Sequence, residues 1–288
     1  MALFALLAIL LVLLLCSAYS AQRWGFGFLA LLAPLFCIEI FAGGAWAAAL
    51  LCAIFIGGLA GLAADKKLPF AIYTACAPLF AAAVISGDYY YGKAKTGIDP
   101  FERSTEQTLQ IVETADIPQE QKKLLTSQLK VIAETVKGVI PFCAFVYSLL
   151  FSAVGFLAVK RFFLYLKKEV QQGALAAFEL NGYVVFALIA AWAGVLFLMK
   201  TGGIVYYGFL NAALMISALY FVQAIGVLSF FLKSKNISGW MVGIPFCLLL
   251  IAGGGISVLL IIMLTGVGVL DLWADFRKLH TKETGGLS

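Results

Sequence analysis

Residues 204–232 read IVYYGFLNAALMISALYFVQAIGVLSFFL and contain no charged side chain. A membrane-spanning helix needs about 20 consecutive apolar residues, because hydrocarbon satisfies no backbone hydrogen bond. Similar blocks recur along the chain, whose 288 residues are 63% hydrophobic and only 12% charged, with a mean hydropathy of +1.01. The sequence therefore predicts an all-α protein: a polytopic transmembrane helical bundle that forms a single integral membrane domain over residues 1–288.

Further apolar blocks are long enough to span a bilayer; they cover residues 2–20, 25–42, 45–64, 69–87, 138–159 and 182–199. The first block lacks the basic residues that open a signal peptide, so we expect it to remain as a span. The last block, residues 237–273, would be about 55 Å long as one straight helix and is expected to break near Pro245 or at Gly253–Gly255. If it crosses twice, the bundle has about nine spans; eight is the alternative.

Basic residues predict which side of the membrane is cytoplasmic, because short cytoplasmic loops collect Lys and Arg. They occupy alternate loops, as Arg23, Lys66, Lys67, Lys160, Arg161, Lys167, Lys168, Lys233 and Lys235. We expect a bacterial cytoplasmic (inner) membrane protein with its N-terminus outside and its C-terminus in the cytoplasm.

Residues 88–137 form a charged insertion between the fourth and fifth predicted spans, where we expect an extracytoplasmic helical hairpin. Asp99, Pro100 and Glu102 supply a cap, a first-turn proline and an acid three residues after the cap, which predict a helix start. After a break at 116–118, a second helix is expected with one apolar face, made by Leu125, Leu129 (or Gln128), Ile132 and Val136. The hairpin is expected to lie over the mouth of the bundle; the alternative is a lid over a substrate entrance.

The chain has few of the residues that enzymes use for catalysis. His280 is the only histidine, which excludes two-histidine metal sites and histidine-based catalysis within the bundle. The six cysteines each stand alone in apolar runs, as small buried hydrophobic residues do. No phosphate-binding loop is present. We expect no enzymatic activity, no catalytic residue, no metal site and no cofactor, and any ATP-driven work would need a partner.

Polar residues within apolar spans are the candidate substrate-binding residues, because they are costly in lipid. They are Glu39, Asn211, Tyr220 and Gln223. The alternative for Glu39 is a carboxylate near the membrane interface. The alternative for Asn211 and Gln223 is hydrogen bonding between neighbouring helices.

A ridge of small residues is expected to serve helix packing; it consists of Ala45, Ala49, Ala53, Gly57 and Gly61, which recur every four residues. Packing within the chain is favoured over a docking surface for another subunit.

The end of the last span carries Asp271 and Asp275 on one helix face, followed by Arg277. Two like charges in the last turns of a helix are unfavourable. We therefore predict that one or both aspartates pair with Arg277 or with a loop base such as Arg161 or Lys233, which would hold the cytoplasmic tail beneath the bundle. The alternative is a solvated helix end with Trp273 at the membrane interface.

The C-terminal third carries a family resemblance. Residues 211–232, the basic loop after them and the ending GVLDLWADFR at 268–277 resemble the YybS-like family of predicted bacterial membrane proteins. Ile140-Pro141, which opens a span ending at Lys160-Arg161, also fits, so the resemblance covers about residues 25 to 280. This chain departs from the family in having Ala224 where a glycine usually follows the glutamine, and the family often has an additional N-terminal span.

The YybS-like family has no established biochemical function. It is distantly similar to the S components of energy-coupling-factor transporters, which bind a nutrient from the outer face and depend on a separate ATPase module. The resemblance implies a transport-related protein that captures a small solute of unknown identity, with the lipid bilayer and such an energising module as partners. The alternative is a non-catalytic membrane scaffold or assembly protein that recruits other membrane proteins. No nucleic-acid partner is expected in either case.

Overall fold

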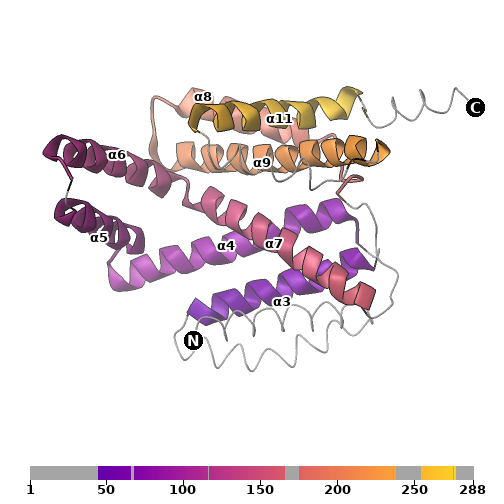
Figure 1. The fold of residues 1–288 in the computed structure, drawn as a ribbon, viewed down its shortest axis with the longest axis horizontal. Helices are drawn as coiled ribbons and strands as arrows, with labels where there is room; N and C mark the ends of the chain where they lie inside the picture. The colour runs from indigo at the N-terminus through magenta and orange to yellow at the C-terminus, as the bar shows by residue number, and fades with distance from the viewer. Residues whose placement is uncertain are drawn as a thin grey trace, which may run out of the picture. The chain divides into compact units, whose positions relative to one another are not determined.

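The computed structural model describes residues 45–65, 68–115, 117–165, 175–235, 237, 254–274 and 276. All regular secondary structure within these ranges is helical, which confirms the all-α prediction there (Figure 1). The helices are α3 (Ala45–Ala64), α4 (Phe70–Thr96), α5 (Pro100–Thr114), α6 (Gln119–Gly138), α7 (Ile140–Tyr165), α8 (Val184–Leu198), α9 (Gly203–Ser234) and α11 (Gly254–Ala274).

Within the described ranges, four helices are long and apolar enough to cross a membrane: Phe70–Thr96, Ile140–Tyr165, Gly203–Ser234 and Ser257–Ala274. Two shorter apolar helices, Leu51–Ala64 and Val184–Leu198, also fall on predicted spans. The predicted spans at 2–20 and 25–42 lie outside the described residues, as does Pro245. The total of eight or nine spans therefore stays a prediction.

The largest difference from the expected boundaries is at the end of α4. The fourth predicted span ends at residue 87, whereas α4 continues to Thr96. A helix of 27 residues is about 40 Å long and exceeds a hydrocarbon core of about 30 Å. The final turns of α4 therefore extend past the apolar segment and lead directly into α5.

The chain divides into two compact packing units, residues 1–62 with 76–166 and residues 63–75 with 167–288. In the first unit, α3 packs against α4 through the stacked rings of Phe55 and Phe80, whose centroids lie 3.9 Å apart. Ala53, Gly57 and Gly61 of the predicted ridge are buried within the chain. The side chains of the other two members, Ala45 and Ala49, are outside the described set. The single membrane domain with an insertion at 88–137 stays a prediction.

In the second unit, α9 lies alongside both α8 and α11 (Figure 1). Glycine makes both approaches possible. A Cβ at Gly194 would overlap the ring of Phe209, and a Cβ at Gly268 would overlap the backbone oxygen of Tyr220. Ala191, Val195 and Ala213 form a buried cluster at the α8–α9 contact.

Candidate functional site

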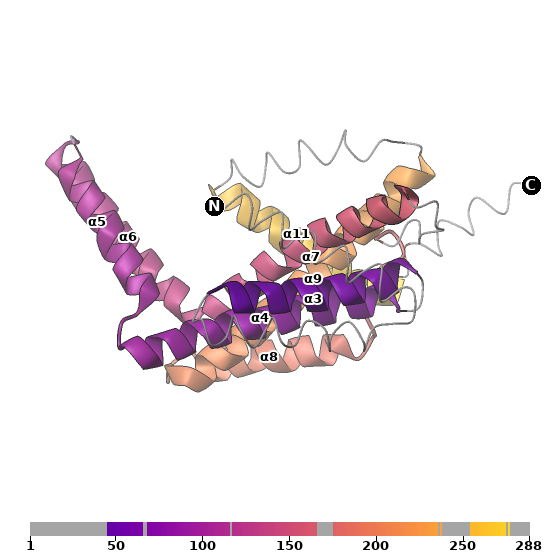
Figure 2. The same cartoon turned by 90° about the horizontal axis from the view of Figure 1, so that it is seen from below.

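The helices α5 and α6 pack side by side as a hairpin that projects away from α3 and α4 (Figure 2). One face of α5 is partly buried against α6, made by Phe101, Thr105, Leu109 and Val112 at helical spacing. On α6, Ala133 is buried. Within the first unit the hairpin projects away from α3 and α4; its position over the mouth of the whole bundle, and the alternative of a lid, stay predictions.

Asp99 fixes the turn between α4 and α5. Its side chain caps α5 by accepting hydrogen bonds from the backbone N–H groups of Phe101 and Glu102, and Pro100 follows at the first helical position, as predicted. The carboxylate also accepts a 2.5 Å hydrogen bond from the Tyr89 hydroxyl and a 2.8 Å hydrogen bond from Lys93 Nζ. Both donors are on α4, so one buried carboxylate joins the two helices.

Burial alone would raise the pKa of the Asp99 carboxyl, because it removes water from the charged form. The hydrogen bonds from Lys93, Tyr89 and the two backbone N–H groups outweigh this effect and hold the pKa well below its usual range. Asp99 is therefore charged at neutral pH. Its charge stabilises the turn between α4 and α5, and all its described partners are residues of this chain.

An ion pair between Glu102 and Lys137 closes the base of the hairpin. It connects the first turn of α5 to the last turn of α6. The Glu102 carboxylate accepts a hydrogen bond from Lys137 Nζ. Together with Asp99, this pair fixes both helices of the hairpin, at the start of α5 after α4 and at the end of α6 before α7.

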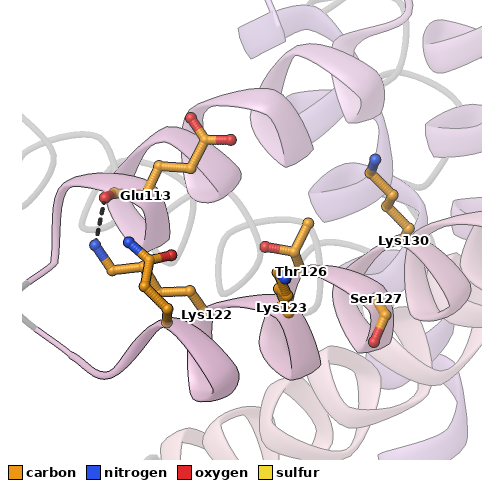
Figure 3. Close-up of a pocket in the computed structure, with 7 residues that line it drawn as sticks. Glu113, Lys122, Lys123, Thr126, Ser127 and Lys130 are labelled. Atoms are coloured by element: carbon orange, nitrogen blue, oxygen red, sulfur yellow. Dashed lines mark hydrogen bonds between the residues drawn. The ribbon is translucent and has the colours of Figure 1, made fainter.

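The far half of the hairpin carries a lysine hollow, an open concavity of about 600 Å³ (Figure 3). It is lined by Glu113, Gln119, Lys122, Lys123, Thr126, Ser127 and Lys130. Lys122 reaches back and donates a 2.8 Å hydrogen bond to the backbone oxygen of Glu113 (Figure 3). Lys123 and Lys130 have no hydrogen-bond or ion-pair partner in the part of the chain that the structure describes.

Next to the hollow, α6 exposes an apolar stripe. Its members are Leu124, Leu125, Val131 and Ile132, of which Val131 is 65% exposed. A second, smaller concavity of about 290 Å³ runs along this stripe and is lined by Ser127, Gln128, Val131 and Ile132. Ser127 borders both concavities, so the lysine hollow and the apolar stripe form one continuous surface on α6.

The second unit contains a buried polar bridge centred on Gln223 of α9. Its side-chain oxygen accepts a 3.1 Å hydrogen bond from the backbone N–H of Leu180, and its nitrogen donates a 3.2 Å hydrogen bond to Asp271 Oδ2 on α11. Gln223 is 1% exposed. Its amide therefore connects α9, α11 and the segment before α8.

The other predicted polar residues divide between this bridge and the rest of the unit. Tyr220 is buried one turn before Gln223, and its hydroxyl has no hydrogen-bond partner among the described residues. Asn211 donates to the backbone oxygen of Tyr207 in its own helix. Asp271 is buried, rather than lying at a solvated helix end, while Trp273 is exposed. Glu39, Asp275 and Arg277 lie outside the described residues.

A comparison with protein families identifies the family of the chain. Residues 2–272 match the model of a family described as "Predicted membrane protein (DUF2232)". The chain belongs to this family. Membership is consistent with the resemblance to YybS-like proteins and with a multi-pass membrane location. The matched region includes both the hairpin and the polar bridge of this DUF2232 protein.

No curated protein and no solved structure matches the chain. The DUF2232 description gives a location and no activity.

Proposed function

We propose that this DUF2232 protein is a non-catalytic membrane interaction protein. Its membrane spans hold the α5–α6 hairpin at the membrane surface, and the hairpin recruits a partner protein. The observation that carries the proposal is the apolar stripe of α6, exposed on a hairpin that is fixed at its base. A contiguous exposed apolar patch that is surrounded by polar residues is typical of an interaction site. The polar surroundings of this stripe distinguish it from the mostly apolar exposed faces of α7 and α8.

The rigid base supports recruitment. Asp99 is hydrogen-bonded from two elements, and the Glu102–Lys137 ion pair closes the other side of the hairpin. A surface that is already ordered before binding loses less conformational entropy when a partner docks. The arrangement favours a permanent display surface over a lid that opens and closes.

The proposed orientation follows the charges of the loops. Placing the basic loops in the cytoplasm puts the N-terminus and the hairpin outside a bacterial cytoplasmic membrane, and the C-terminus inside. The partner would then be extracytoplasmic or would have an extracytoplasmic segment. A membrane-impermeant thiol reagent tests this orientation on a single cysteine placed at exposed Glu106 in a cysteine-free chain: labelling in intact cells is expected, and labelling only after lysis would contradict it.

Recruitment is tested by quantitative co-purification of the full chain from its native membranes. We expect a partner protein whose recovery falls when Val131→Ser and Ile132→Ser are combined. Leu157→Ser is the matched control, because Leu157 is 64% exposed on α7, away from the hairpin. An unchanged set of co-purified proteins in the stripe variant would overturn the proposal.

Capture of a small solute is the second candidate, and one observation favours it. The Tyr220 hydroxyl and the Gln223–Asp271 bridge place polar groups inside an apolar unit, where such groups commonly serve a ligand or ion. Because the sequence has no phosphate-binding loop, uptake would need a separate ATPase or energising module. The bridge itself is directed at internal partners, which supports bracing between helices more strongly than capture.

A thermal-stability screen of the purified chain against vitamins, metal ions and amino acids tests solute capture. A true ligand at about 100 times its Kd stabilises the native state by about 2.7 kcal/mol. Stabilisation that disappears in Tyr220→Phe would support capture. A flat response across a broad set of solutes would exclude it in favour of recruitment alone.

A further inference from the structure

The exposed face of α6 reads the same in both directions from Gln128. The four members of the apolar stripe lie three and four residues on either side of it, and Gln121 and Thr135 lie seven residues on either side. All of these side chains are exposed. Outward from Gln128 in either direction, the face therefore presents two apolar residues and then one uncharged polar residue. In a two-fold contact the same patch serves both partners, and a face with this symmetry is complementary to a second copy of itself.

This face of α6 carries no charged side chain. With 100° between successive residues, its members fall within about 120° of the circumference of the helix. Beyond the edge formed by Val131, the helix carries two acids and two lysines, whose charges cancel: Glu120, Glu134, Lys123 and Lys130. The hairpin segment 100–138 is also close to neutral, with five basic and six acidic residues. Two identical hairpins can therefore approach along this face with little repulsion between like charges.

The Gln128 amide, at the centre of the face, can pair with its own copy. Its side chain is exposed and forms no hydrogen bond within the described part of the chain. An amide carries both a donor and an acceptor, so two copies of one amide can hydrogen-bond to each other. A single amide in an otherwise apolar helix contact commonly fixes its register. Thr135, in contrast, already donates a 2.9 Å hydrogen bond to the backbone oxygen of Val131 in its own helix.

Insertion in one membrane also favours an identical partner. Two copies in the same bilayer cross it in the same direction, so the two-fold axis that relates them is perpendicular to the membrane. The hairpin follows α4 and precedes α7, and both of these helices are long and apolar enough to span a bilayer. Both copies therefore present α6 on the same side of the membrane and at the same height. A contact of one patch with itself closes at two copies.

From these observations, and resting on the proposed interaction function, we infer that the partner at the apolar stripe is a second copy of this chain. In the resulting homodimer, α6 of one copy crosses α6 of the other at Gln128. Because the pattern is the same in both directions, the crossing brings apolar side chains against apolar side chains and Gln128 against its counterpart. The contact covers Leu124 and Val131, which are 59% and 65% exposed in the single chain.

Disulfide cross-linking in membranes tests where the two copies meet. Gln128→Cys, as the single cysteine of an otherwise cysteine-free full chain, is expected to give a disulfide-linked dimer with a mild oxidant. Two residues that face each other at a close helix crossing meet the distance that a disulfide requires. Lys123→Cys is the matched control, because it is exposed on the same helix but points about 140° away. Equal linking at both positions, or none at position 128, would overturn the inference.

A charge swap tests the same contact in a way that misfolding cannot imitate. Two differently tagged full chains are produced together, one tag is purified, and recovery of the other is measured. Gln128→Lys in both copies, or Gln128→Glu in both, should lower recovery roughly tenfold or more, because like charges would meet. Gln128→Lys in one copy with Gln128→Glu in the other should restore it.

The matched control for the charge swap is Gln107→Lys in both copies, at an exposed position of α5. It introduces the same charge on the same hairpin, away from the apolar stripe, and should leave recovery unchanged. Failure of the opposite charges to restore recovery would mean that Gln128 does not face its counterpart, and would contradict the inference.

Failure of the homodimer can be distinguished from failure of the proposed function by the molar mass of the purified chain in detergent. A monomer from which a different protein co-purifies through Val131 and Ile132 would overturn the homodimer and leave the recruiting function intact. A dimer that survives Val131→Ser with Ile132→Ser would place the contact elsewhere and also overturn the inference. A monomer that binds protein-free vesicles through the stripe would assign the stripe to lipid. A monomer with no stripe-dependent partner would reject the recruiting function itself.

Discussion

Lys93 Nζ lies 2.8 Å from Asp99 Oδ2, across the turn that joins α4 to α5. The carboxylate side chain is 2% exposed, whereas the lysine side chain is 49% exposed. Asp99 is thus the buried member of the pair, and the cap, the Tyr89 hydrogen bond and the ion pair all depend on it.

Replacing Asp99 with Ala should loosen the start of α5. The change removes an N-cap, which commonly costs about 1 kcal/mol, and leaves Tyr89 without its acceptor. We expect the amides of residues 101–103 to exchange with deuterium roughly fivefold faster or more. Glu106→Ala, at an exposed site on the same helix, is the control. Equal exchange in both variants would show that Asp99 does not hold the turn.

Acid should open the same turn. The pKa of Asp99 is lowered in the folded chain, so its charged form contributes stability that is complete above the unfolded pKa of about 3.9. As the pH falls below that value, the unfolded state takes up a proton first and the contribution is progressively lost. The difference in exchange at residues 101–103 between the wild type and Asp99→Asn should be constant from pH 7 to 5 and shrink below about pH 4. A difference that grows on acidification would contradict this sign.

Gly268 should be intolerant of a side chain. A Cβ there would overlap the backbone oxygen of Tyr220, and backbone on both sides leaves little room to adjust. Gly268→Ala is expected to lower the Tm in detergent by roughly 3–8 °C, as overpacking usually does. Gly266→Ala is the matched control two residues earlier, because nothing lies within 4 Å of a Cβ at that position. Equal Tm values for the two variants would mean that α11 does not pack on α9 as described.

Both the oxygen and the nitrogen of the Gln223 amide should contribute to the stability of the fold. Gln223→Leu removes the acceptor for the Leu180 N–H and the donor for Asp271, and leaving buried polar groups unsatisfied costs about 1–3 kcal/mol. We expect a lower Tm in detergent than for Gln107→Leu, a control at an exposed position of α5. If both variants have the same Tm as the wild type, the bridge contributes nothing measurable to stability.

Much of the helical framework was predictable because apolar length and cap chemistry are local. The spans at 45–64, 138–159, 182–199 and 204–232 coincide with helices to within six residues at each end, and Asp99 is the cap that the pattern predicts. The end of α4 was not predictable from hydropathy. Its Tyr-Tyr-Tyr-Gly-Lys run marks the end of an apolar block, while the helix continues until Asp99 accepts from Tyr89 and Lys93.

The candidate site was less predictable, because it depends on which side chains are left uncovered. The sequence pattern places Leu125 and Ile132 on an apolar face of a helix, and such a face is normally buried. In the structure α5 covers a different face, the one that contains Ala133, and leaves Val131 and Ile132 exposed. Likewise, the seven-residue spacing of Lys123 and Lys130 is visible in the sequence, but their lack of a partner among the described residues follows only from the packing of the hairpin.

The most direct measurement of the recruiting claim is site-specific photo-cross-linking in cells that naturally produce the chain. A benzophenone amino acid at position 131 samples the stripe, and one at position 157 samples an equally exposed position on α7, at 65% and 64% exposure. We predict a discrete protein adduct from position 131 and no such adduct from position 157. Absence of a protein adduct from position 131, or the same adducts from both positions, would contradict the account.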